Sequence, residues 1–157
     1  MSNAAFYRCA LAGDLSAGVR ALFESLLSRA ARIDGLARSL PDQIRANRER
    51  REGGPVSLSK AERRTIRSFE ADAERAAAEL PSLVASLRPE SLLVRTALES
   101  ERTALRMDRA VHAGGHPEDE ALARPLLELR AANIADLEAF GSGRAQQEVT
   151  PGGDAGR

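Results

Sequence analysis

Apolar residues recur at alternating steps of three and four along most of this chain, which is the spacing of one face of an α-helix. The clearest case is the segment 89–140, in which two such stripes flank the connection 113–117 (AGGHP). The stripes run through Val94, Leu98, Glu101, Leu105, Asp108 and His112, and through Leu122, Leu126, Leu129, Asn133, Leu137 and Phe140. Glycine closes a helix at low cost and proline suits the first turn of the next. The segment therefore predicts two antiparallel, neighbouring helices.

The segment 14–51 predicts one long helix before this hairpin. Its apolar positions are Leu15, Val19, Leu22, Leu26, Ala30, Ile33, Ala37, Leu40 and Ile44. We expect the Asp14 carboxylate to cap the first turn, because aspartate accepts hydrogen bonds from unpaired amides there. Pro41 is expected to bend the helix without ending it, since Ile44 continues the apolar phase. Gly53, Gly54 and Pro55 then end the helix.

A third helix is expected to begin at a capping box formed by Ser59 and Glu62. It carries Ile66, Phe69, Ala73, Ala76, Leu80, Leu83 and Leu87, with a kink expected at Pro81. The Arg88-Pro89 step decides the topology: a turn there gives four long helices, and a bend gives three, one of them long and kinked. The sequence favours the turn, and hence an all-α, elongated antiparallel bundle of four long helices with coiled-coil character.

The two ends of the chain differ from the bundle domain, which is expected to span residues 14–140. Residues 1–13 predict a short helix or arm that carries Phe6, Cys9 and Ala10 on one side and packs as a lid on the end of the bundle. Residues 141–157 are rich in Gly, Ser, Gln and Asp, so this tail is expected to be disordered.

Composition agrees with a single helical domain. The chain has 157 residues, and only five of them are aromatic, which disfavours strands. Its formal net charge is zero, so no overall field recruits nucleic acid or anionic lipid. Cys9 is the only cysteine and therefore has no partner for an internal disulfide. No membrane span or signal peptide is expected, and a cytoplasmic location fits best.

Three polar residues interrupt the apolar stripes of the hairpin. Glu101 and Asp108 do so on the first helix, and Asn133 does so on the second. A polar residue at a core position often fixes helix register at some cost in stability. The alternatives are that neighbouring arginines draw the two acids outward to solvent, or that the three residues bind a ligand.

Metal and catalytic motifs have little support. Asp108, His112, His116 and Glu120 are spaced four residues apart, which would place them on one face of a continuous helix. However, Gly114 and Gly115 interrupt the helix between His112 and His116, so a zinc site would have to form around the loop. The paired Glu-x-x-His motifs of di-iron bundles do not occur. The sequence also lacks the hydrolase motif Gly-x-Ser-x-Gly. It lacks two phosphate-binding motifs as well, a P-loop and Gly-x-Gly-x-x-Gly followed by a helix. We therefore expect no cofactor, no metal and no enzymatic activity.

Charge is unevenly distributed. The segment 45–67 contains eight basic and three acidic residues, whereas the segment 118–138 contains six acidic and two basic residues. The basic segment could bind phosphates. The candidate phosphate-binding residues are Arg48, Arg50, Arg51, Arg63 and Arg64. The same asymmetry also suits association between two copies of the chain.

The function that the sequence favours is a non-enzymatic helical protein-interaction module, such as an adaptor, a chaperone-like protein or an assembly component, that self-associates. Four leucines lie off the main stripes and are candidates for a partner-binding surface. They are Leu27, Leu36, Leu92 and Leu127. The alternatives are nucleic-acid or phosphate binding through the segment 45–67 and, less favoured, a small metal-binding bundle.

Overall fold

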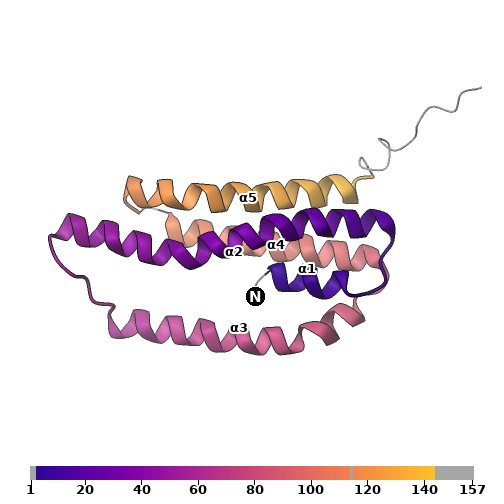
Figure 1. Cartoon of the computed structure of the whole chain (residues 1–157), viewed down its shortest axis with the longest axis horizontal. Helices are drawn as coiled ribbons and strands as arrows, with labels where there is room; N and C mark the ends of the chain where they lie inside the picture. Colours follow the sequence, from indigo (N-terminus) through magenta and orange to yellow (C-terminus); the bar gives the residue numbers. More distant parts are fainter. Residues whose placement is uncertain (1–2, 114, 144–157) are drawn as a thin grey trace, which may run out of the picture.

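A computed structural model describes residues 3–113 and 115–143, apart from the side chains of residues 61, 62, 65, 69, 70, 72 and 73. Every secondary-structure element in these ranges is an α-helix (Figure 1). The helices are α1 (Asn3–Leu11), α2 (Ala17–Glu52), α3 (Lys60–Ser86), α4 (Glu90–His112) and α5 (Pro117–Gly141). The all-helical class that the sequence predicts is therefore confirmed for the described residues.

The hairpin of α4 and α5 has the termini that its sequence predicts. Helix α4 ends at His112, and α5 begins with Pro117 at its first position. Glu118, Asp119 and Glu120 occupy the first turn of α5, where negative charge meets the positive end of the helix dipole. The two helices pack closely against each other and run in opposite directions (Figure 1).

Helix α2 is capped by a different residue from the one we expected. Ser16 is its N-cap, and the Ser16 hydroxyl accepts a hydrogen bond from the Val19 amide at 3.5 Å. The prediction for Asp14 is wrong, because Glu90 binds both the amide and the hydroxyl of Ser16, each at 2.6 Å, and so fixes the helix start there. A contact between segments distant in sequence thus overrides the local preference.

The continuation of α2 past Pro41 and its end before Gly53 are confirmed. The helix continues through Pro41 to Glu52, so this proline does not end it. Gly53 then adopts the left-handed conformation with φ of 72°, and its amide bonds back to the carbonyl of Glu49. Glycine adopts this conformation without the steric cost that a Cβ imposes.

The chain turns between α3 and α4, which excludes one long helix across this region. Helix α3 ends at Ser86, and α4 begins at Glu90, after a cis Arg88-Pro89 peptide bond. The two helices run in opposite directions (Figure 1). Helix α3 begins one residue after Ser59, but the expected capping box also needs the side chain of Glu62, which lies outside the described residues.

Helix α1 lies inside the structure and not as a lid on its end. It packs against α2, α3 and α4, and it lies between α3 and the other long helices (Figure 1). Phe6 and Tyr7 are buried and pack against Phe23 of α2, Phe6 in a tilted and Tyr7 in an edge-to-face arrangement, with ring centroids 6.3 Å and 5.4 Å from that of Phe23. Edge-to-face aromatic pairs at this distance are favourable beyond the area they bury.

The long helices do not associate evenly. Helices α2, α4 and α5 share the main contacts, whereas α3 packs mainly against α1. The expected four-helix bundle and its coiled-coil character are therefore not confirmed. None of the described helices combines the length and apolar content that a membrane crossing requires. Most of the expected tail, residues 144–157, lies outside the described residues.

The aromatic cluster around Phe23 predicts a large stability effect. Phe23→Ala should lower the free energy of unfolding by about 3–5 kcal/mol, because it removes a fully buried ring and leaves a cavity between α1 and α2. Urea unfolding followed by circular dichroism measures the change. Leu92→Ala is the control, since Leu92 is exposed and its truncation should change stability by no more than about 0.5 kcal/mol. Equal effects of the two substitutions would contradict the packing described.

Candidate functional site

A buried polar cluster joins α1, α4 and α5. The carboxylate of Glu101 has no exposed surface, and it accepts hydrogen bonds from the Tyr7 hydroxyl at 2.8 Å and from the Asn133 side-chain amide at 3.0 Å. Arg130 of α5 approaches the other oxygen of Glu101 at 3.4 Å. Each element that surrounds Glu101 thus contributes a donor, as a buried carboxylate requires.

Arg130 extends this cluster toward the surface. Besides Glu101, its guanidinium bonds to the carboxylate of Asp108, one helical turn from the end of α4. The Asp108 side chain is 25% exposed, and that of Arg130 is 12% exposed. The three polar residues that interrupt the hairpin stripes therefore belong to one cluster. Their arrangement matches the interpretation that they fix helix register, and neither acid is drawn outward by its neighbouring arginines.

The Tyr7 hydroxyl acts as a hydrogen-bond donor in this cluster. Burial, followed by the negative charge of Glu101, raises the pKa of Tyr7 above its ordinary value. The hydroxyl therefore stays protonated at neutral pH and donates a hydrogen bond to the carboxylate of Glu101. Because Tyr7, Glu101 and Asn133 are all inaccessible to solvent, the inner part of the cluster holds the helices together and does not contact a dissolved ligand.

An open pocket lies beside the outer part of the cluster. It has a volume of about 430 Å³ and lies between the second half of α2, the end of α4 and the segment that precedes α3. Its apolar lining residues are Leu40, Ile44, Val56, Leu58, Val111 and Leu126. Asp108 and His112 lie along the α4 side, and Arg45 and Arg48 lie along the α2 side. We call this pocket the apolar groove.

Large apolar side chains are also exposed on α3 and α4. Val111, which lines the apolar groove, is 74% exposed, and Met107, one turn earlier on α4, is 52% exposed. Ile66, in the first half of α3, is 45% exposed. Leaving such large side chains in water sacrifices hydrophobic stabilisation.

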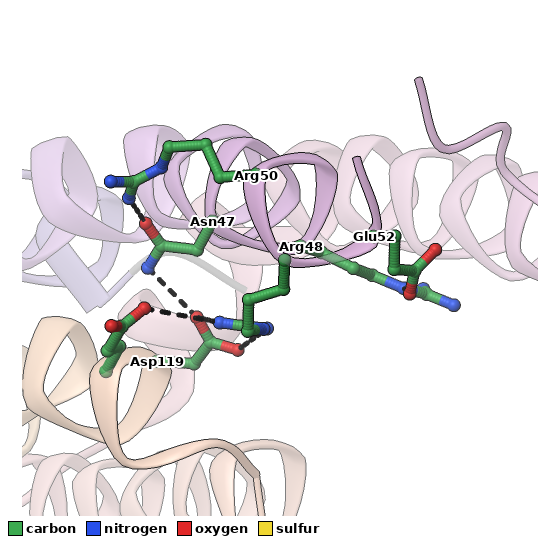
Figure 2. A network of polar contacts seen from close by, with 7 residues as sticks. Asn47, Arg48, Arg50, Glu52 and Asp119 are labelled. Carbon is green, nitrogen blue, oxygen red and sulfur yellow. Dashed lines mark hydrogen bonds and ion pairs between the residues drawn. The ribbon is translucent and has the colours of Figure 1, made fainter. Parts of the chain in front are cut away.

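Three of the five arginines proposed to bind phosphate lie on α2, and the other two lie on α3. Those on α2 contact other residues of the chain, as Figure 2 shows for Arg48 and Arg50. Arg48 bonds to Glu52 at 3.0 Å, and Arg50 donates a hydrogen bond to the side-chain amide oxygen of Asn47. Arg51 bonds to Asp119 at 2.7 Å. Arg63 and Arg64 are exposed on α3. Arg51 in particular connects α2 to the start of α5, and so it stabilises the fold.

The four leucines proposed as a partner surface are also dispersed. Leu27 is half-buried against the core, and Leu36 and Leu127 are half-buried as well. Of the four, only Leu92 is exposed, at 38%, and it lies at the opposite end of α4 from the apolar groove. Sequence reasoning missed the groove because an apolar residue such as Val111 looks the same in the sequence whether another helix covers it or not.

The residues considered for a metal site are separated. His112 lines the apolar groove, whereas His116 is exposed and precedes α5 as its N-cap residue. Asp108 is bound by Arg130. Among the described residues, no group of three or more histidine, cysteine, aspartate or glutamate side chains lies close enough to hold a metal ion.

The Tyr7–Glu101 hydrogen bond can be tested by removing one oxygen atom. Tyr7→Phe should lower the free energy of unfolding by about 1–3 kcal/mol, because it leaves a buried carboxylate without one of its donors while keeping the ring in place. Urea denaturation measures the loss. The double variant Tyr7→Phe with Glu101→Gln should lose less than the sum of the two single variants, and simple additivity would contradict a direct interaction.

The contact between Arg51 and Asp119 predicts a pH dependence. Hydrogen bonds from Arg51 and then Asn47 lower the pKa of Asp119 below its ordinary value. A lowered pKa in the folded state contributes stability above the unfolded value, about 3.9, which is lost as the pH falls through the folded pKa. Asp119→Asn should therefore be less stable at pH 7 and lose less stability on acidification.

Urea midpoints measured between pH 7 and pH 2 test this prediction. Glu120→Gln is the matched control, because Glu120 is exposed and lies one residue further along the same helical turn. The control should retain the acid dependence of the original protein. A control curve that is flattened as much as that of Asp119→Asn would show that general charge, and not the Arg51 contact, causes the dependence.

Comparisons with known proteins do not assign the chain to a family. No protein-family model, curated protein or solved structure matches the chain. The inner part of the buried polar cluster is closed to solvent, whereas the apolar groove is open to another molecule.

Proposed function

We propose that this protein is a non-enzymatic helical interaction module that binds a helix of another protein, or of a second copy of itself, in the apolar groove. The observation that supports this most is the groove itself, an opening of about 430 Å³ with mainly apolar lining and exposed Val111 at its edge. Amphipathic helices bind such grooves by inserting side chains at helical spacing.

Helix α1 is an example, within this chain, of the binding mode we propose. It lies between α3 on one side and α2 and α4 on the other, and it buries Ala4, Phe6, Tyr7 and Ala10 there. Its nine residues span about 14 Å, whereas the 27 residues of α3 span about 40 Å. The apolar groove begins on α2 at Ala37, beyond the part of α2 that holds Phe23 against α1.

Protein binding is better supported than phosphate binding. Three of the five candidate arginines are already engaged on α2, and Arg51 would have to leave Asp119 to contact a phosphate. The apolar groove, in contrast, needs no rearrangement of the core to accept a side chain. A coiled-coil-like packing of the bound helix against α2 and α4 is the form of complex that we propose.

A neutral amphipathic peptide tests the proposed function. The probe is a fluorescein-labelled helix of about fourteen residues with leucine on one face and alanine and glutamine on the other. We expect saturable binding by fluorescence anisotropy, with amide chemical-shift changes around Ile44, Leu58 and Val111. Val111→Glu should weaken binding at least about tenfold, because it places a charge at the apolar edge of the groove.

The matched control for this experiment is Leu83→Glu, which places the same charge at an exposed leucine of α3 outside the groove. Light scattering of the chain alone completes the test, because a dimer that dissociates on Val111→Glu identifies a second copy as the bound partner. A monomer that binds no peptide, or whose binding ignores Val111→Glu, would refute the proposed function.

A further inference from the structure

The first part of α3 is left uncovered by the rest of the described chain. Among the side chains of α3 that the structure describes, those of residues 60–79 are exposed except for the half-buried Ala76, and the first buried one is that of Leu80. From there on α3 joins the core, since Leu80 and Leu87 belong to the same cluster as the buried residues of α1. Figure 1 shows α1 beside the end of α3 and not beside its beginning. We call residues 60–79 the lid segment.

The lid segment has an exposed apolar residue on the side that faces the other long helices. Ile66 precedes Leu80 by 14 residues, which is almost four full turns, so the two side chains lie on the same face of α3. Leu80 faces the layer that α1 occupies between α3 and the pair α2 and α4. Ile66 therefore faces the same layer beyond the reach of α1, and there it is 45% exposed.

The lid segment starts beside the apolar groove. Val56 and Leu58 line the groove, and α3 begins at Lys60, directly after them. Helices α2 and α3 run in opposite directions from this connection, and Ile44 and Ile66 each lie about two turns away from it (Figure 1). Closing the lid segment onto the groove would therefore bring Ile66 to Ile44. Because the connection is short, the effective concentration of the lid segment at the groove is on the order of millimolar.

Pro81 provides a hinge at the end of the lid segment. It lies inside α3 and has no amide hydrogen, so the Ala77 carbonyl lacks its usual helical donor. Sharp kinks in helices occur mainly at such prolines. The lid segment is about 30 Å long, so moving its tip by one interhelical spacing of about 8–10 Å requires a bend of about 15–20°. A bend of this size at Pro81 does not require Leu87 to leave the core.

We infer that the lid segment closes over the apolar groove and competes there with the helix of a partner. In the closed form, Ile66 packs against Ile44 and Val111, so apolar side chains that are now exposed on α3 and α4 leave water together. The structure shows the open form. This inference goes beyond the proposed function because it describes a control of access to the groove, and closure itself requires no partner.

Distances between two nitroxide labels, measured by pulsed electron spin resonance, test closure in the full chain alone. The labels are attached at Ala46→Cys and Arg64→Cys in a Cys9→Ser background, so that the one native thiol is not labelled. Both positions are exposed, and each lies two residues from Ile44 or Ile66, on the far side of its helix from the groove. We expect two distance populations that differ by about 8–10 Å, the shorter one from the closed form.

Two substitutions on α3 assign the shorter distance to the lid segment. Ile66→Glu should abolish it, because closure would bury the new charge against Ile44 and Val111. Leu83→Glu is the matched control, since it places the same charge at an exposed leucine of α3 beyond Pro81 and should keep both populations. A single distance that Ile66→Glu does not alter would overturn the inference. Loss of the shorter distance on mixing with excess unlabelled protein would also overturn it, because the lid would then cover the groove of a second copy.

The neutral amphipathic peptide used to test the proposed function measures the competition. Ile66→Glu should bind this peptide at least about threefold more tightly than the original chain, because the binding-competent fraction rises, and Leu83→Glu should not. A shorter distance without peptide binding to any variant would support closure and refute the proposed function. Peptide binding that Ile66→Glu leaves unchanged would overturn the competition and leave the proposed function standing.

Discussion

The buried carboxylate of Glu101 is the constraint on which the arrangement of helices depends. A carboxylate without access to water is tolerated only when hydrogen-bond donors surround it. Here the donors come from separate elements, Tyr7 of α1 and Asn133 and Arg130 of α5, while α4 supplies the acid itself. Any slip of one helix along another would leave Glu101 without partners. One polar residue thereby specifies the register of three helices and the position of α1 among them.

The position of α1 in turn explains why the apolar groove is open. Because Phe6 and Tyr7 fill the space beside Phe23, α3 packs mainly against α1 and not against the other long helices. Helix α1 is much shorter than α3, so it covers only part of α2 and α4. The apolar groove is lined by the remaining part of these helices, and its opening leaves Val111 in water. The outer end of the polar cluster, at Asp108, lies against the groove, so helix register and groove shape are connected.

Local signals predicted the individual helices well. Gly53, Pro117 and the steps of three and four act through the backbone of adjacent residues, so their effects do not depend on the rest of the fold. Where a distant residue competes, the local signal was insufficient. Asp14 was expected to cap α2, but Glu90 binds Ser16 and moves the cap by two residues. Likewise, α1 was expected to be a peripheral lid. The prediction failed because the sequence shows that α1 has an apolar side but not which helices cover that side.

The sequence by itself determined that the chain is helical, where α2 and α4 end, and which polar residues interrupt the apolar faces. These properties follow from hydrophobic periodicity and from the conformational limits of glycine and proline, which are encoded within a few residues. Only the tertiary structure decided that Tyr7 meets Glu101, that Arg51 is held by Asp119, and that Val111 edges an open groove and is not buried in the core. The Arg51–Asp119 and Tyr7–Glu101 contacts join residues that are 68 and 94 positions apart in the sequence. Hydrophobic periodicity shows that a helix face is apolar, but it does not show which other helix packs against that face.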